Sequence, residues 1–396
     1  MKTTPPEMLE ATRLTREGRL SEAMSLIRKL LGAEGQAPSP AREPGAPSTL
    51  PMLDLVAQEV ATETSQKKPR GAKSHASTIG SKSAGKKTRL FDSTQNVGVG
   101  RTSKPSAVSE LAPAGGTFVS EAFSNAAGTR TYKLYSPSGA AQGPRPLIIM
   151  LHGCTQSADD FAAGTRMNFA AEEHTCFVAY PEQISAANVS KCWNWFQTGH
   201  QTREQGEPSI IAGIAKDIMS KHNIDPRRIY VAGLSAGGAA AAVVAQAYPD
   251  VFAALGVHSG LACGVARDLP SAMAAMQGRH APYTPGQQHP IPTIVFHGDQ
   301  DRTVHPRNGA EIVKGAAGGV KFDQEVEHGV VPEGRRYSRS IQRDRTGKEV
   351  IEDWVIDGAG HAWSGGSKAG SFTDPLGPDA TKEMLRFFLA HERSDR

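Results

Sequence analysis

The sequence has no apolar run near the roughly 18 residues that a membrane-spanning helix needs, which excludes an integral membrane helix. Four cysteines in 396 residues are too few for the disulfide framework of a small secreted domain. The first residues, MKTTPPE, lack the apolar core of a secretory signal. We therefore expect a cytoplasmic protein, or an extracellular one if a leader was removed or a route other than Sec is used.

Net positive charge is confined to one segment. The net charge is +4, but residues 67–104 hold ten Lys and Arg against one acid, Asp92. The rest of the chain is therefore net negative. A basic segment of this kind can contact anionic surfaces, although a solvated linker is its ordinary interpretation. We expect no specific nucleic-acid partner.

Composition divides the chain into three zones. Residues 1–32 carry apolar side chains three to four apart, which predicts a short helical, hairpin-like segment. Residues 33–112 are rich in Pro, Ser, Gly and Lys and predict a disordered linker. Residues 113–396 alternate apolar runs with amphipathic stretches and predict the folded domain.

Short continuous apolar runs in the third zone are typical of buried parallel strands. They alternate with helical stretches, which predicts an α/β fold: a mostly parallel central sheet with helices on both faces. The expected strands are 146–151, 177–180, 228–232, 254–257, 293–296 and 352–357, and the expected helices are 167–173, 210–222, 236–247 and 380–390.

The strongest chemical motif is GLSAG at residues 233–237. It follows a predicted strand and precedes an Ala-rich helix, which is the context of a nucleophile elbow. The turn is sharp, so small residues must flank the serine, and the helix N-terminus favours developing negative charge. This pattern predicts Ser235 as a nucleophile.

A nucleophilic serine needs a base that an acid orients, and in α/β-hydrolases the acid follows the serine along the chain. Residues 297–304, HGDQDRTV, come directly after a predicted strand. Asp301 is the preferred acid, and Asp299 is expected to brace the loop.

The base must follow the acid. His361 lies in the Gly-rich sequence GAGHAW at residues 358–363. Of the 13 histidines, His258 is the main rival because it follows a predicted strand near the elbow. Chain order favours His361.

Acyl transfer also needs N–H donors for the oxyanion. One is expected from Ala236, the residue after the nucleophile. The other is expected from the loop LHGCTQ at residues 151–156, through the N–H of Cys154, with Gly153 as the alternative.

These motifs together resemble the polyhydroxybutyrate (PHB) depolymerase family of esterases. The resemblance covers residue 128 to the C-terminus and rests on LHGCTQ (151–156), YPEQ (180–183), CWNWF (192–196), GLSAGG (233–238) and GHAWSGG (360–366). It implies an α/β-hydrolase fold and a serine esterase with Ser235, Asp301 and His361 as its triad, without a cofactor.

Membership in this family leaves the substrate open. We expect a short-chain hydroxyalkanoate polyester, its oligomers or a related ester. Feruloyl or acetylxylan esters on the same triad are the first alternative. The second is a binding protein with little catalysis that acts through its basic segment.

The resemblance also makes a Cys154–Cys192 disulfide plausible, next to the oxyanion loop, with two buried thiols as the alternative. No C-x-x-C pair is present, so we expect no metal. Trp193, Trp195 and Trp363 lie within or beside these motifs, and we expect at least one of them to bind substrate, although core packing is the alternative.

Overall fold

The computed structural model describes residues 111–139, 143–279 and 290–393. The predicted segment at 1–32 and nearly all of the predicted linker at 33–112 lie outside these residues. In chain order the elements are β1 (Thr117–Asn125), β2 (Gly128–Ser136), β3 (Arg145–Leu151), α3 (Ala158–Thr165), α4 (Met167–Glu173), β4 (Phe177–Pro181), the 3-10 helix η2 (Thr198–His200), α5 (Gly206–Lys221), β5 (Ile224–Leu234), α6 (Ala236–Ala247), β6 (Ala254–His258), α7 (Leu269–Met276), β7 (Thr293–Gly298), α8 (Arg307–Ala317), β8 (Asp323–Val330), β9 (Arg336–Arg343), β10 (Glu349–Ile356), β11 (Trp363–Ser364), β12 (Thr373–Asp374) and α9 (Ala380–Leu389).

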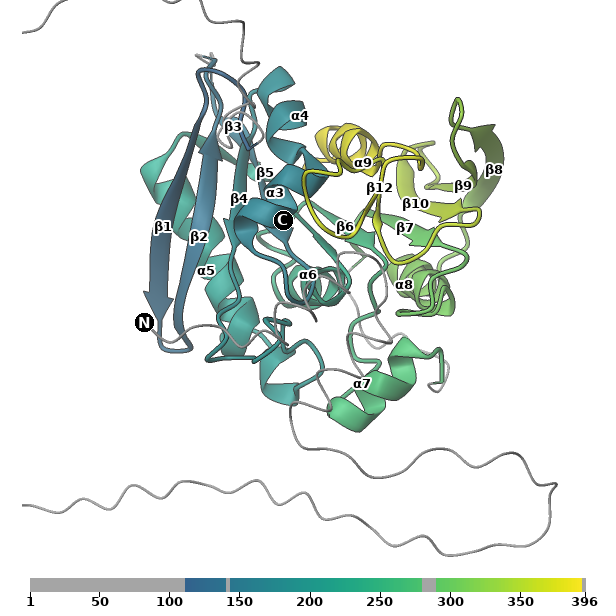
Figure 1. The fold of residues 1–396 in the computed structure, drawn as a ribbon, viewed down its shortest axis with the longest axis horizontal. Helices are drawn as coiled ribbons and strands as arrows, with labels where there is room; N and C mark the ends of the chain where they lie inside the picture. The colour runs from purple at the N-terminus through teal and green to yellow at the C-terminus, as the bar shows by residue number, and fades with distance from the viewer. Residues whose placement is uncertain (1–110, 140–142, 280–289, 394–396) are drawn as a thin grey trace, which may run out of the picture. The chain divides into compact units, whose positions relative to one another are not determined.

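Ten strands form one sheet in the order β1-β2-β4-β3-β5-β6-β7-β10-β9-β8, with β1 and β8 at its two ends (Figure 1). The six central strands run parallel to one another: β4, β3, β5, β6, β7 and β10. An antiparallel hairpin flanks them on each side. The α/β fold predicted from the alternating runs is confirmed.

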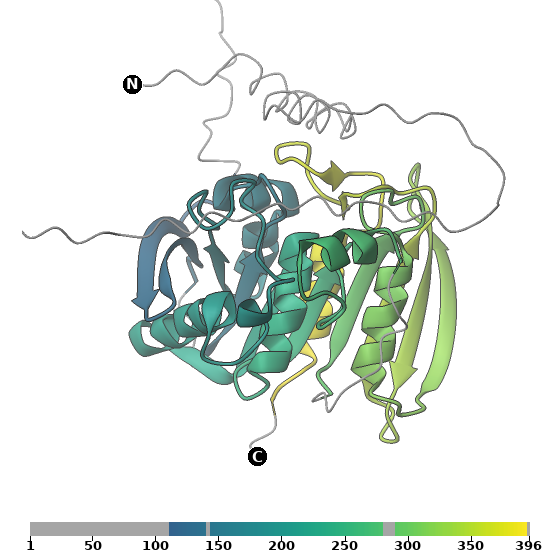
Figure 2. The same ribbon diagram turned by 90° about the horizontal axis from the view of Figure 1, so that it is seen from below.

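Helices cover both faces of the sheet (Figures 1 and 2). In β3, Leu147 and Ile149 pack into the core beneath α5 and α6, whereas Ile148 and Met150 pack with α3, α4 and α9. Both sides of this strand are buried, which explains its continuous apolar run.

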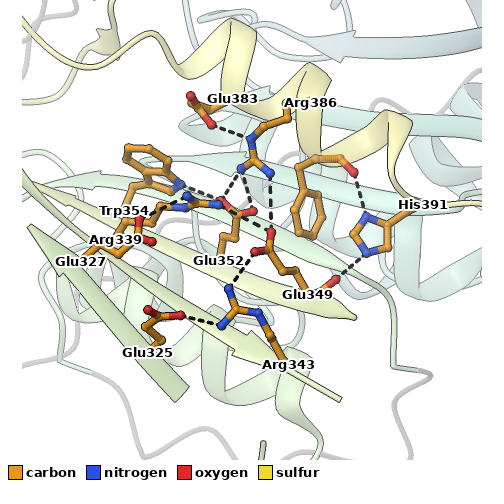
Figure 3. Close-up of polar contacts among 11 residues, drawn as sticks. Glu325, Glu327, Arg339, Arg343, Glu349, Glu352, Trp354, Glu383, Arg386 and His391 are labelled. Atoms are coloured by element: carbon orange, nitrogen blue, oxygen red, sulfur yellow. Dashed lines mark hydrogen bonds and ion pairs between the residues drawn. The ribbon is translucent and has the colours of Figure 1, made fainter. Parts of the chain in front are cut away.

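Ion pairs join the two strands of the β8–β9 hairpin to each other and to β10. Arg343 of β9 pairs with Glu325 of β8 at 2.7 Å and with Glu349 of β10 at 3.0 Å. Fully buried Glu352 of β10 pairs with Arg386 of α9 at 2.7 Å (Figure 3). This cluster ties α9 to the sheet.

The parallel strands carry the site residues to one edge of the sheet. The carboxyl ends of β3, β5 and β7 lead into residues 152–156, 235–238 and 299–304, and β10 leads into 357–362. Open α/β sheets bind ligands along such an edge. No helix within the described ranges combines the length and apolar character that crossing a membrane requires.

Candidate active site

Ser235 lies at the junction where β5 ends and α6 begins. Its backbone has φ 58° and ψ −121°, a conformation that non-glycine residues adopt only under strain. Gly233 and Gly237 make this turn possible, because a Cβ at either position would collide with the carbonyl oxygen of Leu151. The predicted elbow is therefore present in its predicted context.

Asp301 and His361 meet at this edge. His361 Nδ1 lies 2.7 Å from Asp301 Oδ2, and the other carboxylate oxygen accepts the N–H groups of Thr303 and Val304. Burial alone would raise the pKa of Asp301, but hydrogen bonds from His297 and His361 hold it well below its ordinary value. The carboxylate is thus anionic, and His361 Nδ1 must donate to it.

Asp299 has a different position. Its Oδ1 accepts the N–H of Gly358 at 2.6 Å, and its own N–H donates to Ile356 at 3.2 Å. It therefore joins the loop after β7 to the loop that carries His361. The geometry matches the bracing role expected for Asp299.

His258, the rival base, is fully buried between the rings of Phe296 and Trp363. Its Nε2 accepts the N–H of Ser364 at 2.9 Å, so this nitrogen has no free lone pair. Burial lowers the pKa of His258 well below its ordinary value. The ring is a neutral structural group, and the geometry favours His361 as the base.

Two backbone N–H groups near Ser235 are free to donate a hydrogen bond. Within the described part of the chain, neither the Cys154 N–H nor the Ala236 N–H has an acceptor. The Gly153 N–H is occupied, because it donates to Gln156 Oε1 at 2.8 Å. This loop lies against the nucleophile, since a Cβ built on Gly153 would be 3.7 Å from Ser235 Cβ. Cys154 thus fits the second donor position better than Gly153.

A disulfide joins Cys154 to Cys192, as the resemblance implied. A backbone hydrogen bond from Thr155 to Ser190 runs beside it at 2.8 Å. The disulfide therefore fixes the 188–196 loop to the predicted oxyanion loop.

A buried polar network that the sequence did not reveal joins Gln183, just after β4, to Asn194 in the 188–196 loop. Buried Glu207 accepts from the Gln183 side chain at 2.5 Å and from the N–H and side chain of Asn194 at 2.7 and 2.8 Å. Arg130 donates to Gln183 Oε1 at 2.9 Å. Gln183 and Asn194 belong to two of the motifs that carry the family resemblance, and this network gives them a shared structural purpose.

The three tryptophans are buried. Trp193 donates to His152 O at 3.1 Å, Trp363 donates to Thr381 Oγ1 at 3.0 Å, and their exposed fractions are 0% and 1%. Trp195 is 6% exposed and packs edge-on against Phe196. This burial favours core packing, the alternative to substrate contact, for Trp193 and Trp363, and leaves Trp195 little free surface.

The arrangement lacks one contact of a closed triad. Among the described residues, Ser235 Oγ has no hydrogen bond to His361. Such contacts are commonly long without substrate and tighten in the complex. A serine at a strained turn, an acid–histidine pair and two open N–H donors are together the parts that acyl transfer requires.

Comparisons with known proteins agree with this chemistry. The family described as "Esterase PHB depolymerase" matches residues 130–315. Poly(3-hydroxyalkanoate) depolymerase C of Paucimonas lemoignei is 34% identical over 238 residues, which are 57% of this chain and 56% of that protein. This chain thus spans little more than half the length of that relative.

Two fungal relatives match over more of their own length. Feruloyl esterase B of Neurospora crassa is 30% identical over 67% of this chain and 89% of its own. The probable acetylxylan esterase A of Aspergillus clavatus is 28% identical over 58% of this chain and 78% of its own. An acetyl xylan esterase structure from Aspergillus awamori, 22% identical, superposes with a TM-score of 0.51 over 62% of this chain and 93% of its own, which supports the fold.

Proposed function

The chain belongs to the Esterase PHB depolymerase family and is a serine carboxylic ester hydrolase, and from this premise we propose that it cleaves short-chain hydroxyalkanoate polyester or its oligomers. The 34% identity to a poly(3-hydroxyalkanoate) depolymerase, against 28% and 30% for the two fungal relatives, favours this ester class. We place the activity in residues 113–396.

The proposed reaction begins when Ser235 Oγ attacks the ester carbonyl carbon. His361 Nε2 takes the serine proton, and Asp301 holds the ring with its Nδ1–H toward the carboxylate. The resulting imidazolium is stabilised by that carboxylate. The observation that carries this assignment is the 2.7 Å contact between His361 Nδ1 and Asp301 Oδ2.

The tetrahedral oxyanion is proposed to accept hydrogen bonds from the N–H groups of Cys154 and Ala236. Each such donor lowers the barrier by about 3 kcal/mol. His361 then protonates the leaving alcohol, and the acyl group remains on Ser235. Water, deprotonated by His361, hydrolyses this acyl-enzyme and restores the serine.

Feruloyl or acetylxylan ester hydrolysis on the same triad is the second candidate, and the coverage of the two fungal relatives supports it. The test is hydrolysis of a p-nitrophenyl acyl series beside clearing of an amorphous PHB suspension, with methyl ferulate and acetylated xylan in parallel. Clearing that Ser235→Ala abolishes supports the polyester proposal. Turnover confined to feruloyl or acetyl esters contradicts it and supports the second candidate.

A further inference from the structure

A second histidine touches the proposed triad acid. His297, near the end of β7, is 2% exposed. Its Nε2 lies 3.4 Å from Asp301 Oδ2, the oxygen that also receives His361, and 2.8 Å from the carbonyl oxygen of Val304. The mechanism described above does not use this ring.

The contacts of His297 determine its protonated nitrogen. A carbonyl oxygen can only accept, so the nitrogen that faces Val304 must carry a proton. The other nitrogen, Nδ1, is buried and has no partner in the described part of the chain. A proton there would be a buried donor without an acceptor, which is costly. His297 is therefore a neutral ring that donates through Nε2.

Helix α8 keeps the far side of this ring in place. A Cβ on Gly309 would lie 3.1 Å from His297 Nδ1, so the helix backbone approaches the ring closely. The ring cannot turn away from Asp301 without displacing α8. The position of His297 is thus fixed by packing as well as by its hydrogen bonds.

Other titratable groups lie around His297. Asp353 on β10 has its pKa raised to about 6 by burial. Glu311 on α8 pairs with Arg307 at 3.6 Å. His258 on β6 is neutral, and the loop after β7 contributes Asp301 itself.

We propose that His297 is a positioning residue of the esterase: its single Nε2–H, donated to the Val304 carbonyl at 2.8 Å and lying 3.4 Å from Asp301 Oδ2, fixes the loop that holds the Asp301 carboxylate, and so sets how well Asp301 pairs with His361. This inference rests on the proposed triad. Without this ring the Asp301 carboxylate is less firmly held against His361, and its negative charge is less compensated, which favours the imidazolium form of His361 in the free enzyme. The imidazolium form of His361 then persists to higher pH, so a higher pH is needed to supply the neutral ring that acts as the base.

The test compares His297→Phe with His297→Gln on a p-nitrophenyl ester across pH, with rates normalised to active sites titrated by a serine-directed phosphonate. Phe keeps a ring without a donor, whereas the Gln side-chain amide can donate from the position of Nε2. His391→Phe is the matched control. His391 is 1% exposed and contacts the backbone carbonyls of Phe387 and Glu349 beside α9 (Figure 3).

We expect His297→Phe to lower kcat about tenfold with little change in KM, because a less firmly held Asp301 carboxylate orients the His361 ring less well. The acid limb of the plot of kcat/KM against pH, where the rate falls on acidification, should move to higher pH by roughly half a unit or more. His297→Gln should restore most of the rate and the original limb. His391→Phe should lower Tm and leave kcat per active site and the limb unchanged.

Wild-type kcat and an unmoved acid limb in His297→Phe would overturn the proposal, even if Tm falls. If that variant does not fold, His297→Asn replaces it, because its shorter amide does not extend to Asp301. Wild-type kcat and limb in that variant would equally overturn the proposal. Turnover that survives Ser235→Ala in the same assay would instead refute the triad, so the two failures are distinguishable.

Discussion

The carbonyl oxygen of His258 accepts the backbone N–H of Ser235 at 2.9 Å. The ring of the same histidine accepts the N–H of Ser364, three residues beyond His361, also at 2.9 Å. His258 therefore joins the nucleophile elbow to the loop that carries the base. Two segments more than 100 residues apart in sequence are thus joined by one buried residue, through its backbone carbonyl and its ring.

His258→Gln should lower Tm and keep kcat within about tenfold of wild type, because the amide oxygen of Gln can accept from Ser364 as the ring does. His361→Ala should retain wild-type stability and lose about 10⁴-fold or more in kcat. Thermal unfolding and steady-state kinetics on the pair check this. Comparable kcat losses of that size in both variants would contradict the assignment of His361 as the base.

Asp301→Asn should lower kcat by about 10⁴-fold, because an amide in place of the carboxylate favours the wrong tautomer of His361. Asp299→Asn is the matched control, since its amide oxygen can still accept the N–H of Gly358. We expect that control to stay within about tenfold of wild type. If instead the Asp299 variant loses most of the activity and the Asp301 variant does not, the triad acid is Asp299.

Cys192→Ser should lower the free energy of unfolding by roughly 3 kcal/mol, because the disulfide closes a long loop. It should also lower kcat by up to about 100-fold, because the loop that presents the Cys154 N–H becomes less fixed. Cys263→Ser, at a free and partly buried thiol, is the control and should change neither quantity. Urea unfolding and kcat for both variants, with and without dithiothreitol, make the test. A Cys192 variant as stable as wild type would contradict it.

Glu352→Gln should lower the free energy of unfolding by about 3 kcal/mol, because Arg339 and Arg386 lose their buried partner. Glu383→Gln, whose carboxylate is 31% exposed, should cost at most about 1 kcal/mol (Figure 3). Denaturant unfolding of the two variants at neutral pH measures this difference.

The same glutamate predicts a pH dependence. Burial raises the pKa of Glu352, but Arg339 and Arg386 together hold it below its ordinary value of 4.5. Its contribution to stability is therefore complete above that ordinary value and is lost as the pH falls through the lower, folded-state pKa. The stability difference between wild type and Glu352→Gln should shrink on acidification. A difference that stays constant down to pH 2 would contradict this account.

The central strands and two helices were predictable because burial on both faces produces continuous apolar runs. The helices at 167–173 and 236–247 begin and end where they were expected. The flanking hairpins were missed for the opposite reason: β8 is almost wholly exposed and β9 carries Arg339 and Arg343, so neither strand forms an apolar run. The β8–β9 hairpin carries cross-strand ion pairs, such as Arg343–Glu325, that spacing along one segment does not reveal.

The proposed triad residues were visible in sequence because each follows a strand in a motif with small neighbours. The supporting residues were harder to see. His297 stood within the same short motif as Asp301, but only the fold shows that its ring returns to that carboxylate. The role of the tryptophans stayed open in the sequence because aromatic spacing does not distinguish a cleft from a core; in the structure Trp193 and Trp363 are fully buried.

The most direct test of the account is hydrolysis of p-nitrophenyl butyrate by wild-type protein and Ser235→Ala, purified side by side and shown to be equally folded. We predict steady wild-type turnover with a stoichiometric burst of p-nitrophenol under conditions in which deacylation is slow. Ser235→Ala should show no burst and less than about one per cent of the turnover. A Ser235→Ala protein that keeps more than a few per cent of the activity would show that this serine is not the nucleophile.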